Sequence, residues 1–94
     1  MNVAQIILGQ IKALVKWALG AWGAKELVNM GDGLKFKTGG MVKWKGYVHI
    51  TLDEAQDLYN IEFYKKSSGV WKEVARVEGI FADQLVELID SQVG

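Results

Sequence analysis

The side chains that could perform acid–base or metal chemistry are few in this 94-residue chain and form no recognised set. His49 is the single histidine and there is no cysteine, so thiolates and imidazole clusters cannot build a zinc site. As a general base, His49 would need a nucleophile within reach and a third group to orient it. The serines stand in a predicted turn, Ser67 and Ser68, or near the end of the sequence, Ser91. We expect a surface or structural role for His49.

Carboxylates and glycines give no stronger chemical signal. Asp53, Glu54 and Asp57 cluster between two predicted strands, but their spacing does not follow the calcium-loop pattern. We expect Asp53 and Asp57 to cap or end strands. Gly31 and Gly33 flank Asp32, which is typical of a tight turn and not of a nucleotide-binding loop. We therefore predict no catalytic residue, no metal ligand and no cofactor, and hence no enzyme.

One group of basic and aromatic residues is a candidate for binding a macromolecule. It lies on two neighbouring predicted strands with no acid between Asp32 and Asp53. This candidate macromolecule-binding face comprises Lys35, Lys37, Lys43, Lys45, Tyr47 and His49. Lysines neutralise phosphates, and aromatic rings offer stacking surfaces to bases. The alternative without a binding role is that these residues form the solvated face of a half-buried sheet, where lysine also keeps exposed edge strands from pairing with another chain. We favour this alternative, because a net charge of zero argues against strong nucleic-acid binding.

Composition bounds the class of protein. Half of the residues are apolar and 11% are aromatic, which supplies the dense core that one small domain, residues 1–94, requires. The first half of the chain is basic and the second half acidic, which hints at a partner. The absence of cysteine favours the cytoplasm. Lys12 and Lys16 interrupt the apolar N-terminal stretch, so we expect neither a membrane-spanning helix nor a signal peptide.

Apolar spacing predicts a helix at each end of the chain. The first stripe is Ile7, Ile11, Leu14, Val15 and Ala18, ending near Leu19, and the second is Ile80, Phe81, Leu85, Leu88 and Ile89. Trp17 and Trp22 are expected to close the core. The same N-terminal stripe offers two alternatives, a membrane-interface helix and a docking surface for a second copy. Of these, we expect no membrane contact and keep the homodimer open.

Between the helices, two-residue alternation predicts strands at residues 25–30, 34–38, 43–52, 58–65 and 70–77. Turns are expected at Gly31–Gly33, Gly39-Gly40 and Ser67–Gly69. In the clearest strand, Trp44, Val48, Ile50 and Leu52 point inward, and Gly46 marks a bulge or a close backbone approach. The fold expected is α+β, an antiparallel meander of four to five strands with the two helices packed on one face.

Several short blocks in this order resemble a family of small proteins from phages, plasmids and other mobile elements of bacteria, notably Bacteroidetes. The blocks are Trp22-Gly23-Ala24, Gly33 to Phe36, Lys45 to Leu52, Asp57 to Ile61 and Leu85 to Asp90. The resemblance implies a mobile-element origin and a stand-alone domain, and it carries no catalytic residues. The function expected first is thus a non-enzymatic accessory protein that binds a protein partner, for example as an inhibitor of a defence system. The alternative is a small nucleic-acid-binding module that uses the lysine-bearing sheet face.

Overall fold

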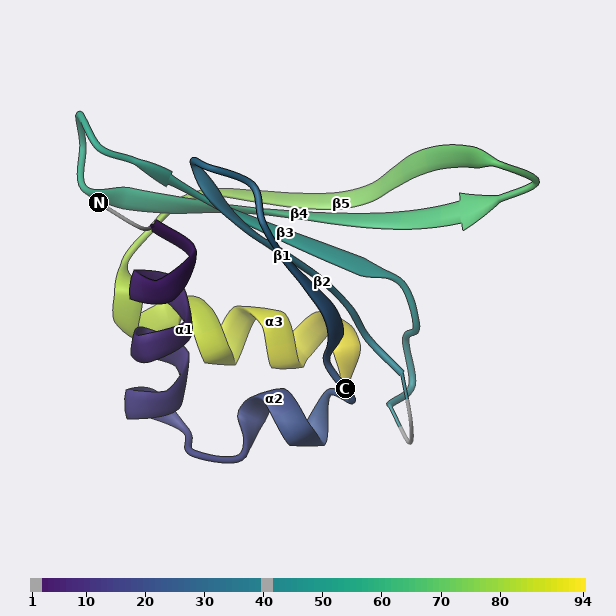
Figure 1. The fold of residues 1–94 in the computed structure, drawn as a ribbon, viewed down its shortest axis with the longest axis horizontal. Helices are drawn as coiled ribbons and strands as arrows, with labels where there is room; N and C mark the ends of the chain where they lie inside the picture. Colours follow the sequence, from purple (N-terminus) through teal and green to yellow (C-terminus); the bar gives the residue numbers. More distant parts are fainter. Residues whose placement is uncertain (1–2, 40–41) are drawn as a thin grey trace.

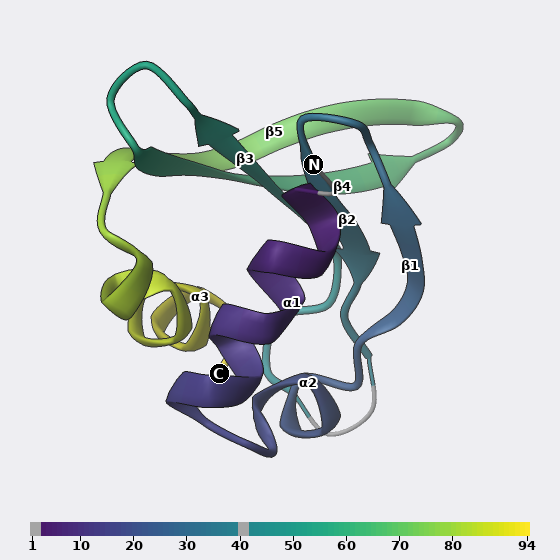
Figure 2. The same cartoon turned by 60° about the vertical axis from the view of Figure 1, so that its left-hand side comes forward.

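The computed structural model describes residues 3–39 and 42–94. The order of elements is α1 (Val3–Leu14), α2 (Ala18–Ala21), β1 (Lys25–Asn29), β2 (Gly33–Lys37), β3 (Tyr47–Asp53), β4 (Leu58–Ser67), β5 (Val70–Ile80), a 3-10 turn (Ala82–Gln84) and α3 (Leu85–Val93). The strands form one antiparallel sheet in the order β1-β2-β3-β4-β5, and the helices lie on one side of it (Figures 1 and 2). The predicted α+β meander with a helix at each end is confirmed.

The core lies between the sheet and the helices, where alternate strand residues point inward. Phe36, Val48 and Phe63 are register partners across β2, β3 and β4, and all three are buried. Trp22 is also buried; its ring stacks on Phe36 with centroids 6.0 Å apart. The Trp22 Nε1–H donates to Asp90 Oδ1 at 3.2 Å, which ties the chain before β1 to α3. The prediction that Trp22 closes the core is confirmed.

The first predicted helix is interrupted at residues 15–17. Helix α1 ends at Leu14, and a separate short helix begins at Ala18, because the chain must turn back beneath the sheet to enter β1. Leu14 and Val15 are consequently half-exposed, and Trp17 is 74% exposed instead of lying in the core. No helix in the described ranges has the length and apolarity needed to cross a membrane.

The start of the C-terminal helix is also corrected. Strand β5 continues to Ile80, which pairs with Tyr59, so the burial of Ile80 comes from the strand and not from a helical stripe. Phe81 is 63% exposed, and α3 begins only at Leu85. The side-chain oxygen of Gln84 accepts a hydrogen bond from the Phe81 N–H at 3.0 Å, which fixes the turn between strand and helix.

The segment before β3 is a loop rather than the start of the predicted strand. Trp44 still packs inward, with its ring edge-to-face against Phe63 at a centroid distance of 5.7 Å. The close approach predicted at Gly46 is confirmed, because a Cβ there would lie 2.6 Å from the carbonyl oxygen of Tyr64. The turn predicted at Gly39-Gly40 falls partly outside the described residues.

Candidate functional site

The open face of the sheet, opposite the helices, collects four of the six residues of the predicted face. Lys35 is the register partner of His49, and Lys37 is the partner of Tyr47. These four side chains alternate with the buried residues of β2 and β3, so they point away from the core, and all are half-buried. The alternation of side chains along β2 and β3 therefore places both lysines beside the two rings.

The other two predicted residues lie in the loop before β3, and the structure separates them. Lys45 lines the same groove as Lys37 and Tyr47. Lys43 lies next to Gly94 at the end of α3, where the Trp44 N–H donates to the carbonyl oxygen of Val93 at 3.0 Å. Lys43 is therefore not part of this groove, and its inclusion in the predicted face is corrected, because residues 43–46 do not continue the strand.

The β4–β5 hairpin contributes three residues that the sequence reasoning missed. This hairpin projects beyond the rest of the sheet in Figure 1. It brings Lys66 and Trp71 to the open face, where the Trp71 ring centroid lies 4.5 Å from that of Tyr47. Lys65 follows Phe63 on the inward side of β4, and its Nζ lies 5.9 Å from the Trp44 ring centroid. Basic and aromatic residues on both sides of the Ser67–Gly69 turn were the available signal, but their meeting with Tyr47 depends on the pairing of β3, β4 and β5.

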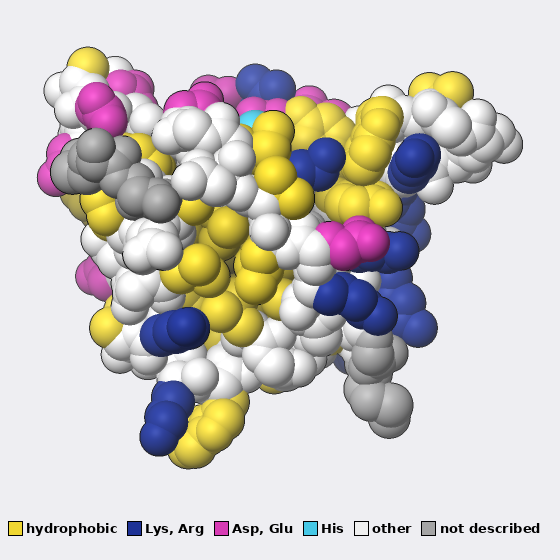
Figure 3. All heavy atoms as spheres, in the orientation of Figure 1, with side chains coloured by type: hydrophobic (Ala, Val, Ile, Leu, Met, Phe, Trp, Pro, Cys, Tyr) yellow, Lys and Arg dark blue, Asp and Glu magenta, His cyan; other side chains and the backbone are white. Residues whose placement is uncertain are grey.

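These residues form a groove of about 410 Å³, which we call the lysine groove. It is lined by Lys37, Lys45, Gly46, Tyr47, Lys65 and Lys66. Four cationic side chains thus surround one cavity, and no acidic side chain is among these lining residues. Figure 3 shows Lys and Arg side chains gathered below the projecting hairpin, whereas most acidic side chains in view lie toward the other end of the sheet. This arrangement suits an anion that spans several phosphate-sized positions.

Lysine ammonium groups also lie against the rings of Tyr47 and Trp71. Lys35 Nζ lies 4.1 Å from the Trp71 centroid and 5.4 Å from the Tyr47 centroid, and Lys66 Nζ lies 5.3 Å from the Trp71 centroid. A cation–π contact at an exposed site stabilises by only about 0.5–1 kcal/mol. These contacts order the rings and lysines in the free protein, yet they are weak enough for a ligand to replace.

Three acidic side chains of the β4–β5 hairpin are held together by one arginine. Arg76 lies 2.9 Å from a carboxylate oxygen of Glu73, 3.2 Å from one of Glu78 and 3.8 Å from one of Glu62. These exposed pairs add little to stability. Their consequence is electrostatic, because Arg76 partly neutralises the acids that share the sheet with the lysine groove.

A buried hydroxyl holds the loop that carries Lys45. The Gly46 N–H donates to Thr38 Oγ1 at 2.9 Å, and that hydroxyl lies 3.2 Å from the carbonyl oxygens of Trp44 and Gly46. We expect Thr38→Val to lower the free energy of unfolding by about 1–3 kcal/mol, because it leaves buried backbone groups without a partner. Urea denaturation measures the loss. Thr38→Ser keeps the hydroxyl and should lose less; equal losses would contradict this role of the hydroxyl.

Tyr64 provides a pH-dependent prediction. Its hydroxyl donates to Glu62, and this bond, together with burial, raises the pKa of Tyr64 from 10.0 to about 12. Because the pKa is raised in the folded state, the stabilisation is complete below pH 10.0 and is lost as the pH rises toward about 12. Ultraviolet titration of tyrosinate should show a late step near pH 12 that Tyr64→Phe removes. Glu62→Gln should shift that step to lower pH, and an unmoved step would contradict the assignment.

The remaining candidates have structural roles. Asp53 ends β3, and its Oδ1 accepts a hydrogen bond from the Ala55 N–H at 3.1 Å, so it caps the turn as expected. Within residues 3–39 and 42–94, no three His, Cys, Asp or Glu side chains are grouped to hold a metal ion.

Comparisons with models of protein families, with curated proteins and with solved structures give no match for this chain.

Proposed function

We propose that this protein is a non-catalytic binding module that holds single-stranded nucleic acid on the open face of its sheet. The observation that carries the proposal is the lysine groove, in which four lysines line one cavity with Tyr47, whose ring contacts Trp71. Lysines along a groove follow a phosphate backbone, while aromatic rings stack on successive bases. The two requirements of single-strand binding thus meet at one surface.

A single strand fits this surface better than a duplex. The residues that line the lysine groove come from strands and from the loop before β3, and none comes from a helix, so no helix would enter a major groove while the lysines contact the same duplex. Trp71 is 44% exposed and Tyr47 is half-buried, so both rings are accessible to an unpaired base. Stacking on an aromatic side chain contributes about 1–3 kcal/mol per base, which a paired base cannot supply.

The net charge of zero limits the affinity for nucleic acid but does not prevent binding. Electrostatic attraction in solution reaches about 10 Å at 0.1 M salt, so a strand in the lysine groove senses mainly the four lysines that line it. Each lysine in contact with a single strand contributes about 0.7 to the slope of log affinity against log salt concentration. Four lysines predict a slope of about −3 and moderate affinity.

Fluorescence anisotropy with a labelled single strand and a duplex of matched sequence tests the proposal. The expected result is single-strand binding with a salt slope of about −3 and weaker binding of the duplex. Absence of binding at low salt would contradict the proposal and favour the other partner class predicted from the sequence, a protein. Salt-independent binding would also contradict it.

The proposal is compatible with the mobile-element resemblance. We place this activity in the cytoplasm, as the cysteine-free composition favours.

A further inference from the structure

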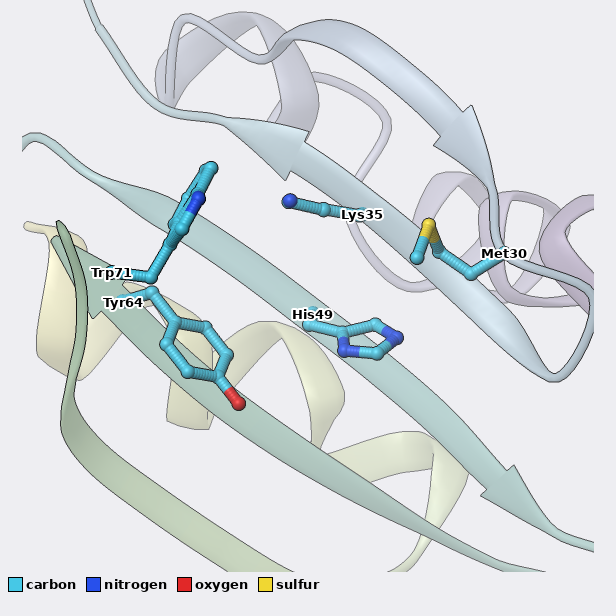
Figure 4. A pocket seen from close by; sticks show the side chains of 5 residues that line it. All are labelled: Met30, Lys35, His49, Tyr64 and Trp71. Atoms are coloured by element: carbon cyan, nitrogen blue, oxygen red, sulfur yellow. The ribbon is translucent and has the colours of Figure 1, made fainter. Parts of the chain in front are cut away.

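A second hollow on the open face lies next to the lysine groove and differs from it in chemistry. Its volume is about 230 Å³. It is lined by Lys35, His49, Tyr64 and Trp71 from strands β2 to β5 and by Met30 from the turn after β1. Figure 4 shows the His49 ring between Tyr64 and Met30, with Lys35 on the side toward Trp71. Flat rings and a polarisable thioether thus bound the space, and only a few polar atoms reach it.

We infer that this hollow is a subsite for one unpaired nucleobase, an inference that rests on the proposed function. The hollow is smaller than the roughly 300–1,000 Å³ of pockets that hold drug-sized ligands, so it suits one planar group rather than a whole oligonucleotide. The lysine groove begins at the same aromatic pair, because Tyr47 lines the groove and its ring contacts Trp71. A strand whose phosphates follow the lysines can therefore turn a base toward Trp71.

His49 supplies the polar group that would read the edge of the base. Its Nε2 is buried and has no hydrogen-bond partner among the residues that the structure describes. Because buried polar atoms are nearly always paired in proteins, and His49 lines the hollow, we expect the ring to turn when a base enters so that this nitrogen gains a partner. The Tyr64 hydroxyl is already used, because it donates to Glu62. His49 is thus the group expected to distinguish one base from another.

Lys35 connects the subsite to the lysine groove. In the free protein its Nζ covers one face of the Trp71 ring at 4.1 Å. A stacked base gains more from that face than an exposed ammonium does, so the base displaces the ammonium. The released ammonium then lies next to the phosphate of the same nucleotide. Binding thereby exchanges a weak internal contact for one stacking contact and one ionic contact.

The test compares the affinities of single strands made only of adenine, only of cytosine or only of thymine. Wild-type protein is expected to favour one of them by about three- to tenfold, the range of one net hydrogen bond. His49→Phe keeps a ring but removes both nitrogens, and it should make the three affinities equal without changing the salt slope. Lys45→Ala is the matched control. It should weaken the binding of all three strands equally and reduce the magnitude of the salt slope by about 0.7.

The outcomes separate the subsite from the proposed function. Salt-dependent binding with equal affinity for the three strands, or a preference that survives His49→Phe, would overturn the subsite and leave the proposed function standing. Absence of binding would overturn both. If His49→Phe does not fold, as judged by circular dichroism, Trp71→Ala provides the second test, because Trp71 is exposed near the hairpin tip. Trp71→Ala should lower the affinity for the favoured strand by about tenfold and reduce the preference for it over the other two strands. Unchanged binding would refute the subsite.

Discussion

Replacing Lys65 and Lys66 together with glutamate is expected to weaken single-strand binding by about 100-fold at about 50 mM salt. The estimate follows from counterion release, in which each lost phosphate contact removes about 0.7 from the salt slope and about tenfold in affinity at this salt concentration. Charge reversal also places two carboxylates in the lysine groove, where they repel the backbone. Both residues are exposed at the end of β4, so the substitution should leave the fold intact.

The control for this experiment changes the same charge elsewhere. Lys12 and Lys16 are exposed on the helical side of the molecule, at the end of α1 and just after it. Their double replacement with glutamate alters the net charge equally but should reduce affinity only a few-fold. Equal losses for the two double variants would mean that total charge governs binding, and the lysine groove would lose its role. Anisotropy titrations at one salt concentration decide between these results.

Phe36→Ala is expected to have the largest effect on stability, a loss of about 3–5 kcal/mol in the free energy of unfolding. Phe36 is fully buried, is flanked by Val48 on β3 and stacks on Trp22 across the layer between sheet and helices. A cavity there would remove contacts from both layers at once. Domains of this size are stable by only about 5–15 kcal/mol, so the variant should retain a small part of its stability.

Phe81→Ala is the matched control, because it deletes the same side chain where 63% of it is exposed. Its loss should stay within about 0.5 kcal/mol. Urea denaturation of both variants measures the difference. A comparable loss at Phe81 would contradict the structure, because it would place Phe81 in the core as the helical stripe predicts. A negligible loss at Phe36 would contradict the inward face of β2.

The sheet could be predicted because its signal is local. Alternation along β3 and β4 places Val48, Ile50, Ile61 and Phe63 inward without knowledge of any other strand, and turn residues mark the ends of most strands. The helical regions were less predictable. The exposure of Trp17 and Phe81 depends on where the chain must turn to meet the sheet, which apolar spacing along one segment does not encode.

The candidate site was predictable only where it follows one hairpin. Lys35, Lys37, Tyr47 and His49 lie on adjacent strands, so alternation was enough to bring them together. The contribution of the β4–β5 hairpin was not predictable in this way. Trp71 contacts Tyr47 because three strands pair in register and the hairpin extends past β3, a consequence of non-local pairing. The hollow beside His49 arises from the same pairing.

Nuclear magnetic resonance of isotope-labelled protein titrated with a single-stranded oligonucleotide tests the central claim most directly. The signals of Lys37, Tyr47, Lys65 and the Trp71 indole should shift on binding, and nuclear Overhauser contacts should join the two rings to base protons. Signals of α1 and α3, on the other side of the sheet, should stay in place. Shifts confined to the helical side, or no shift at low salt, would contradict the account.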